Sequence, residues 1–195
     1  SKIVRAMKVA FVVYDGMTLL DFAGAYDPVT RLNSMGFVPD LFCTICARTE
    51  TVRSSEGVVL AECSTPESLG EFDYVIVPGG DGVQGLMKDP AFLHWIAAVP
   101  ETTTLVGICG GSLLLGAAGL LRTRRATTHP ALRPVLAHFA REVSTDRIVD
   151  EGRIITAGGV TAAIDLGLYF CEKIAGPDVR EKIAAQMDYS CYRRT

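Results

Sequence analysis

The sequence predicts an α/β fold, a mostly parallel sheet sandwiched by helices. Residues 7–14 form a near-continuous, Val-rich apolar run, which is typical of a strand buried on both faces. Residues 72–77 and 102–108 repeat this pattern, and each run leads directly into a glycine-rich turn. Segments with helical periodicity separate these strands, and such alternation favours parallel strands joined by crossover helices.

The remaining elements follow in order along the chain. We expect strands at residues 7–14, 38–46, 72–77, 102–108 and 125–128, a hairpin or edge region at 51–61, and a strand pair at 148–156 broken at Gly152. We expect helices at residues 19–34, 83–98, 112–121, 131–140, 161–175 and 179–187. Pro90 should split the second of these helices. Residues 1–195 are interpreted as one domain, with 1–6 as a flexible N-terminal extension.

Composition and charge exclude several classes of protein. Of the 195 residues 49% are hydrophobic and 21% charged, which excludes a disordered chain. Lys and Arg number 19 against 22 Asp and Glu, so the net charge of −3 lacks the basic excess of a nucleic-acid binder. We find neither a membrane-spanning run nor a signal peptide. We therefore expect a cytoplasmic protein that binds neither nucleic acid nor membrane.

The six cysteines are too sparse for a disulfide framework: Cys43, Cys46, Cys63, Cys109, Cys171 and Cys191. Cys43 and Cys46 form a C-x-x-C motif, but it lies within a strand-like run, where residues three apart point to opposite faces. Buried core cysteines are therefore favoured, with a redox or zinc pair as the alternative. No metal site is expected.

The first glycine-rich turn covers residues 78–85. Gly80, Gly82 and Gly85 spell G-x-G-x-x-G between a strand and a helix, which is the context of a dinucleotide-binding loop. The acidic residue that such a site needs at the end of the next strand is missing, because that strand ends at Ile108 and Cys109. The favoured alternative is a loop whose backbone N–H groups face developing negative charge.

The second turn, residues 107–112, places Cys109 in a nucleophile-elbow context between a strand and a helix. A nucleophile at this strained corner is presented at the carboxyl end of the sheet, and the flanking glycines prevent clashes. The following helix should stabilise the thiolate through its N-terminal dipole. Cys109 is therefore the candidate nucleophile, with a merely packed cysteine as the alternative.

Two residues could handle protons beside this cysteine. Asp21 lies between Leu20 and Phe22 in an apolar segment, where a buried acid needs a reason. A helix N-cap is the alternative interpretation of Asp21. His129 follows a short strand and is either a base near Cys109 or a hydrogen-bonded residue in the wall of the site.

Together these motifs resemble the ThiJ/PfpI superfamily. The resemblance is carried by residues 20–24 (LDFAG), 78–80 (PGG), 108–112 (ICGGS), 125–129 (RATTH) and 157–161 (AGGVT). It implies a flavodoxin-like sandwich of the class I glutamine amidotransferase type, a reactive cysteine at Cys109, and a homodimer.

Departures from the superfamily pattern separate its branches. Asp21 followed by Phe-Ala-Gly is similar to the isocyanide (isonitrile) hydratases, although Gly110 stands where they usually have Thr. The glyoxalase and deglycase branch has Glu near the position of Asp21. The same segments also occur in sensor domains of AraC-type transcription regulators, whose helix-turn-helix domain we do not expect in a chain of this length.

The hydratase resemblance implies a lyase that converts an isocyanide and water to an N-substituted formamide. Cys109 would form a thioimidate and Asp21 would supply the proton. The backbone of Gly80 and Gly110 would hold developing charge, and Val160 would line the substrate pocket with His129. Neither metal nor organic cofactor is expected. The alternatives are a glyoxalase or deglycase acting on small α-oxoaldehydes, and a non-catalytic thiol or ligand sensor.

Overall fold

Six strands form one central sheet in the order β2-β1-β5-β6-β10-β9 in the computed structural model, which describes residues 5–190. The strands are β1 (Met7–Val12), β2 (Leu41–Cys46), β5 (Tyr74–Val77), β6 (Thr104–Ile108), β9 (Ile148–Asp150) and β10 (Ile154–Ala157). All neighbours pair in parallel except β9, which runs antiparallel to β10. The predicted fold class is therefore confirmed. Residues 1–4 of the expected N-terminal extension lie outside the described residues.

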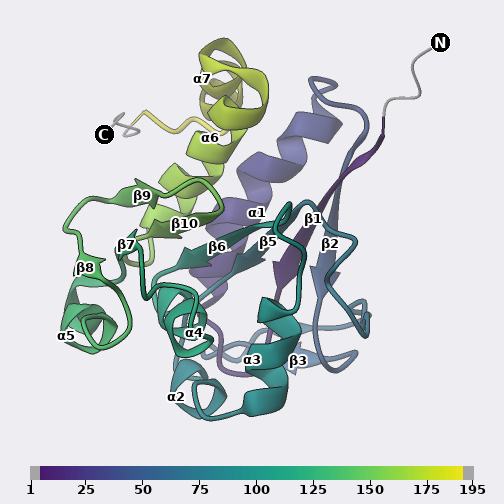
Figure 1. Cartoon of the computed structure of the whole chain (residues 1–195). Helices are drawn as coiled ribbons and strands as arrows, with labels where there is room; N and C mark the ends of the chain where they lie inside the picture. Colours follow the sequence, from purple (N-terminus) through teal and green to yellow (C-terminus); the bar gives the residue numbers. More distant parts are fainter. Residues whose placement is uncertain (1–4, 191–195) are drawn as a thin grey trace.

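Helices cover the sheet on both sides (Figure 1). One face carries α1 (Leu19–Ser34) and α6 (Ala162–Ala175), which pack against each other, with α7 (Pro177–Gln186) against α6. The other carries α2 (Val83–Leu86), α3 (Pro90–Ala97) and α4 (Gly111–Ala117). The structure confirms the predicted bounds of α1 and the break at Pro90. No helix among residues 5–190 is long and apolar enough to cross a bilayer.

The smaller elements lie outside the central sheet. They are the hairpin of β3 (Val52–Arg53) and β4 (Val59–Leu60), the pair of β7 (Arg125–Ala126) and β8 (Glu142–Val143), the 3₁₀ turn η1 (Pro130–Leu132), and α5 (Arg133–Leu136). The predicted helix over residues 131–140 is wrong in extent. Pro130 and Pro134 each fit only the first turn of a helical segment, so two short turns replace one helix.

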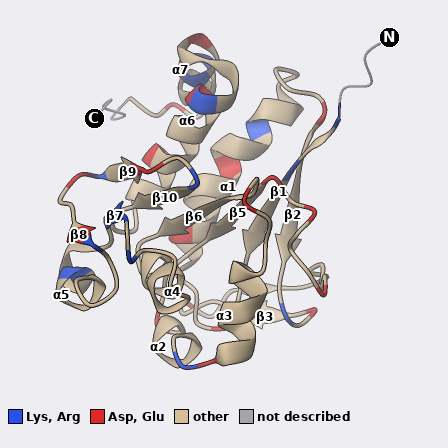
Figure 2. Cartoon of the chain, viewed as in Figure 1, with Lys and Arg blue, Asp and Glu red and all other residues tan. Residues whose placement is uncertain are grey.

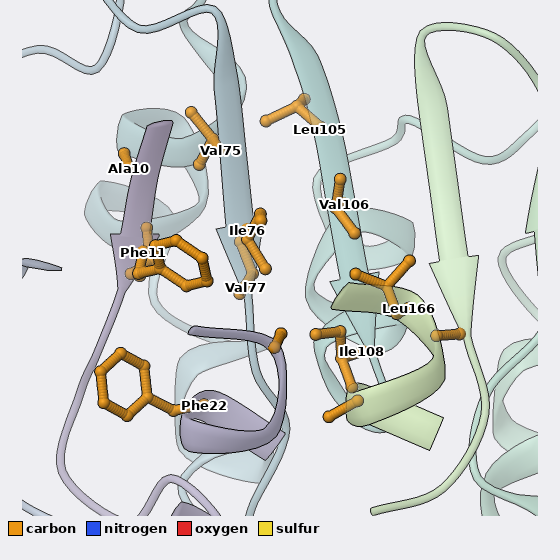
Figure 3. Packing of buried hydrophobic residues seen from close by; sticks show 14 of the residues in the cluster. Ala10, Phe11, Phe22, Val75, Ile76, Val77, Leu105, Val106, Ile108 and Leu166 are labelled. Atoms are coloured by element: carbon orange, nitrogen blue, oxygen red, sulfur yellow. The ribbon is translucent and has the colours of Figure 1, made fainter. Parts of the chain in front are cut away.

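The core extends between the sheet and the helical layers on both of its faces. Figure 3 shows Phe11 of β1 facing Phe22 of α1, and Ile108 of β6 near Leu166 of α6. The rings of Phe11 and Phe22 pack edge to face with centroids 6.1 Å apart. Figure 2 shows acidic and basic residues mixed over the outer helices and loops, while the central strands carry few charges. This pattern is expected where parallel strands are covered on both faces.

The chain order creates a switch point between β1 and β5. From β1 the chain passes through α1 to β2 on one side, then returns to β5 on the other side of β1. Ligands of open α/β sheets bind in the crevice that such a reversal leaves at the carboxyl ends of the strands. The segments after β1, β5, β6 and β10 lead from this edge, with Asp21 in α1 after β1, Gly80 after β5, Cys109 after β6 and Val160 after β10.

Candidate active site

Cys109 occupies a strained corner at the end of β6. Its φ of +56° lies in the left-handed region, which non-glycine residues rarely adopt. Three hydrogen bonds hold this conformation: its N–H donates to the carbonyl of Ala157 (3.1 Å), and its carbonyl accepts from the Thr128 hydroxyl (2.6 Å) and the Ser112 N–H (3.2 Å). The structure thus has the nucleophile-elbow geometry that the flanking glycines predict.

Asp21 enters the site from the first turn of α1 and is fully buried. Its Oδ2 accepts the backbone N–H of Gly79 at 3.0 Å. Thr18 is the N-cap residue of α1, and the N–H of Leu19 donates to Glu56 in the β3–β4 hairpin (2.9 Å). The helix-cap interpretation of Asp21 is therefore wrong. Its carboxylate binds the loop after β5 instead of its own helix.

Asp21 and Cys109 perturb each other's ionisation. Burial raises the pKa of Asp21 from 3.8 to about 7, although the Gly79 N–H and the Cys109 thiol lower it in part. Burial and the negative charge of Asp21 raise the pKa of Cys109 from 9.0 to about 11, against the lowering effect of the Val160 and Gly110 N–H groups. The helix N-terminus would favour a thiolate, but burial and the charge of Asp21 act in the opposite direction and raise the pKa of the thiol above its ordinary value.

The second oxygen of Asp21 is the unusual atom of the site. Oδ1 is buried and has no nitrogen or oxygen partner among residues 5–190. A buried carboxylate oxygen without an N–H or O–H donor favours the protonated form of the acid, because a buried charge with few partners is costly. The site thus offers one oxygen fixed by Gly79 and one oxygen free to carry a proton.

Cys109 opens into a cavity of about 600 Å³. The lining residues come from five segments and are mostly apolar: Thr18, Gly80, Asp81, Val83, Gln84, Met87, Cys109, Leu113, His129, Ala131, Leu132, Val135 and Val160. The structure thus brings Gly80, His129 and Val160 into one wall with Cys109, as the sequence predicts. Gly110 lies within the same turn, and the fully buried Asp21 lies beside it.

The glycines of the loop after β5 are explained by close packing. Gly80 has a φ of +143°, and a Cβ there would lie 2.3 Å from the carbonyl oxygen of Gly16. A Cβ on Gly82 would lie 2.2 Å from the carbonyl oxygen of Asp15. The G-x-G spacing therefore lets this loop pack on the β1–α1 loop, which brings Gly79 to Asp21.

His129 is a hydrogen-bonded wall residue, one of the two roles predicted for it. Its Nδ1 accepts the N–H of Ala131 at 3.0 Å, so the neutral ring carries its proton on Nε2. The ring packs against Gly159, where a Cβ would lie 2.5 Å from the ring carbon Cδ2. With Nδ1 engaged in this turn, His129 shapes the wall of the cavity.

Two residues of this site escape the sequence analysis. Glu56 reaches it from the β3–β4 hairpin, where it bonds to the start of α1, and no local pattern signals this contact. Tyr14 follows β1, and its buried hydroxyl donates to the carbonyl of Pro78 (2.5 Å). Its place at the carboxyl end of the first strand is the one signal that could have indicated it.

The C-x-x-C cysteines belong to separate neighbourhoods. Cys43 lies near Tyr26 and Cys171, whereas Cys46 lies near Cys63. Cys43, Cys46, Cys63, Cys109 and Cys171 are all free thiols, and Cys191 lies outside the described residues. Burial raises the pKa values of Cys43, Cys46 and Cys171 to about 12. Within residues 5–190, no three His, Cys, Asp or Glu side chains gather as they would around a metal ion.

Comparison with known proteins shows the family of the chain. Residues 7–173 match the DJ-1/PfpI family. The chain is 34% identical over 187 residues to an isonitrile hydratase of Pseudomonas putida, covering 95% of this chain and 79% of that protein. It is 30% identical over 183 residues to the HTH-type transcriptional regulator CdhR of Pseudomonas aeruginosa, covering 90% of this chain and 53% of the regulator.

Comparison with solved structures indicates the same family. A THiJ/PfpI family protein from Pseudomonas syringae superposes with a TM-score of 0.83 at 28% identity, covering 97% of this chain and 78% of that chain. Both the sequence match and the structural match extend over nearly the whole described chain. The chain therefore belongs to the DJ-1/PfpI family.

Proposed function

We propose that the protein is an isocyanide hydratase, a lyase that adds water to an isocyanide and releases an N-substituted formamide. The observation that carries this proposal is the pairing of Asp21 with Cys109, in which a buried acid of pKa about 7 adjoins a protonated thiol. The 34% identity to an isonitrile hydratase supports it.

The first step needs a base and an acid at the same carbon. The terminal carbon of an isocyanide must gain both a nucleophile and a proton. The Asp21 carboxylate takes the proton of the Cys109 thiol as the sulfur forms a C–S bond to that carbon. Oδ1 of Asp21, which has no nitrogen or oxygen donor among residues 5–190, then gives this proton to the same carbon. The product is a thioimidate, R–N=CH–S–Cys109.

The second step reverses the roles. Water adds to the thioimidate carbon, and the nitrogen gains a proton to give R–NH–CH(OH)–S–Cys109. The C–S bond then breaks, the hydroxyl loses its proton, and the sulfur regains one through Asp21. N-substituted formamide and the free Cys109 thiol result, so no proton or electron is gained or lost overall. The backbone N–H groups of Val160 and Gly110, which lower the pKa of Cys109, stabilise the departing sulfur.

The cavity matches an uncharged substrate. Met87, Leu132 and Val135 face it, while its polar side chains include Gln84 and Asp81. An isocyanide with an aryl or branched alkyl group would bury apolar surface there, at roughly 25 cal/mol for each Å². Gly110 offers only a backbone N–H at this point of the turn, so charge stabilisation depends on the main chain.

By family membership we further propose that the protein forms a homodimer. Light scattering in solution tests this.

A ligand or thiol sensor is the second candidate, because the chain is 30% identical to a transcriptional regulator and spans about half its length. The chemistry of Cys109 favours hydration over a redox sensor. Oxidation to sulfenic and sulfinic acid requires thiolate, and burial together with Asp21 keeps the pKa of this thiol near 11.

An absorbance assay for formamide formation from an aryl isocyanide tests the proposal. We expect turnover by the native protein, none by Cys109→Ala, and native turnover by Cys63→Ala, which removes another buried thiol. A methylglyoxal assay runs in parallel. Turnover of methylglyoxal alone would establish the glyoxalase alternative, and turnover of neither compound would leave the sensor.

A further inference from the structure

Tyr14 is a buried residue that the mechanism above does not use. It lies just after β1 and is 6% exposed, and its ring packs edge to face on Phe92 with centroids 5.9 Å apart. Its hydroxyl donates a hydrogen bond of 2.5 Å to the carbonyl of Pro78. Burial, and the charges of Asp21 and Cys109, raise the pKa of Tyr14 well above its ordinary value, so the phenol remains a neutral donor.

The Pro78 carbonyl belongs to the same peptide group as the Gly79 N–H. In a trans peptide these two groups point in opposite directions from one rigid plane. The N–H side of this plane donates to Oδ2 of Asp21 at 3.0 Å. A continuous chain of hydrogen bonds therefore runs from the Tyr14 hydroxyl through a single peptide to the Asp21 carboxylate.

Such a chain has two physical effects. A donor on the carbonyl polarises the peptide and strengthens the bond that its N–H makes, by perhaps 10–30% for each bond in a chain. It also fixes the rotation of the peptide plane, since both ends are held. The next carbonyl, that of Gly79, accepts the N–H of Thr18 at 2.8 Å, so the loop is anchored on either side of Gly79.

We propose that Tyr14 is a positioning residue whose hydroxyl, acting through the Pro78–Gly79 peptide, orients and strengthens the donor that holds Asp21 beside Cys109. The catalytic meaning of this arrangement rests on the proposed hydration, whereas the chain of hydrogen bonds does not. The proposal predicts that the pKa of Asp21 depends on how strongly the Tyr14 hydroxyl donates, although this hydroxyl bonds to Pro78 and not to the Asp21 carboxylate.

The other groups acting on Asp21 define the background for a test. Cys109 faces it from the turn after β6, Glu56 acts on it from the β3–β4 hairpin, and Tyr14 lies near it from the end of β1. Glu56 raises the pKa of Asp21, while the Cys109 thiol and the Gly79 N–H lower it. Removing the Tyr14 hydroxyl weakens the Gly79 contribution, so the pKa of Asp21 should rise.

The experiment is a carboxyl ¹³C NMR titration of Asp21 in full-length Tyr14→Phe, with Asp21→Asn used to assign the signal. We expect the pKa of Asp21 to rise by roughly a few tenths of a unit. This is the part of the Gly79–Asp21 hydrogen-bond energy that polarisation of the peptide supplies. Tyr26→Phe is the matched control, because it deletes a hydroxyl from the same helix as Asp21, where the Tyr26 ring packs on Phe22. That variant should leave the titration unchanged.

A second variant reverses the sign. A ring-fluorinated tyrosine at position 14 keeps the size and the hydroxyl but donates more strongly, so the pKa of Asp21 should fall. An unchanged titration in both variants, or shifts of the same sign in both, would overturn the proposal. The titration needs no turnover, so the two proposals can fail separately. A native protein without isocyanide activity would contradict the proposed function and leave this inference standing. An active hydratase in which the Asp21 titration does not change would contradict this inference and leave the proposed function standing.

Discussion

Asp21 and Cys109 form a buried pair in which the carboxylate raises the pKa of the thiol, while the thiol lowers the pKa of the acid. Burial and the Asp21 charge raise the pKa of the Cys109 thiol to about 11, and burial raises the pKa of Asp21 to about 7. Both pKa values are raised, so both groups bind their protons more tightly than free side chains do. An acid poised near the working pH can both accept and return a proton, as hydration of an isocyanide requires.

Replacing Asp21 by Asn should make Cys109 more reactive toward iodoacetamide. The substitution removes the negative charge that raises the pKa of the thiol, so more thiolate is present at pH 8. Because a less basic thiolate is also less nucleophilic, the net gain is about threefold for each pKa unit lost. Peptide mapping with limiting reagent measures it. An equal or slower rate at Cys109 would show that the two groups are not coupled.

Glu56→Gln should move the acid limb of the pH profile of kcat/KM to lower pH. The Glu56 carboxylate raises the pKa of Asp21, and Gln keeps an oxygen for the Leu19 N–H while removing the charge. Because Glu56 is exposed, the shift should shrink as salt screens its charge. Profiles of both proteins at low and high salt test this, and a shift to higher pH would contradict it.

Stability should respond to pH through Asp21. Its pKa is about 7 in the folded protein and near 3.8 in the unfolded chain, so the folded state binds this proton more tightly. The resulting stabilisation is complete below pH 4 and is lost as the pH rises to about 7. Relative to the native protein, Asp21→Asn should gain on the order of a few kcal/mol between pH 4 and pH 8. Urea denaturation at both pH values measures this, and a constant difference would contradict it.

Gly80→Ala should destabilise the fold, whereas Gly85→Ala should not. At position 80 a Cβ would clash with the Gly16 carbonyl and the φ is +143°, so a loss of more than about 2 kcal/mol is expected. Gly85 lies in α2 with no atom within 4 Å of the added Cβ, and Ala favours a helix by up to about 1 kcal/mol. Thermal unfolding of the two variants provides the comparison. Equal effects would show that close packing does not fix Gly80.

Local patterns predict much of this molecule. The apolar runs mark β1, β5 and β6, the spacing of apolar residues gives α1 over residues 19–34, and the glycines around Cys109 predict its strained corner. These features depend on residues close together in the chain. The interrupted helix at residues 130–136 is a partial failure, because the two prolines that divide it outweigh the apolar pattern.

Long-range effects were beyond the sequence. The dipole argument for a Cys109 thiolate used only the following helix and left out burial and a carboxylate from α1, both of which raise the pKa of the thiol. The contact of Glu56 with α1 and the bond from Tyr14 to Pro78 join segments distant in sequence. The sheet order, which places β1 beside β5, brings Tyr14 to Pro78, and the β3–β4 hairpin outside that sheet brings Glu56 to α1.

The central claim is that Asp21 moves the proton in a reaction at Cys109, and formamide production by Asp21→Asn tests it most directly. Asn keeps the shape of the side chain and can still accept the Gly79 N–H, but it cannot exchange a proton. We expect a folded protein whose isocyanide turnover is lower by on the order of a hundredfold or more. Native turnover by this variant would contradict the account.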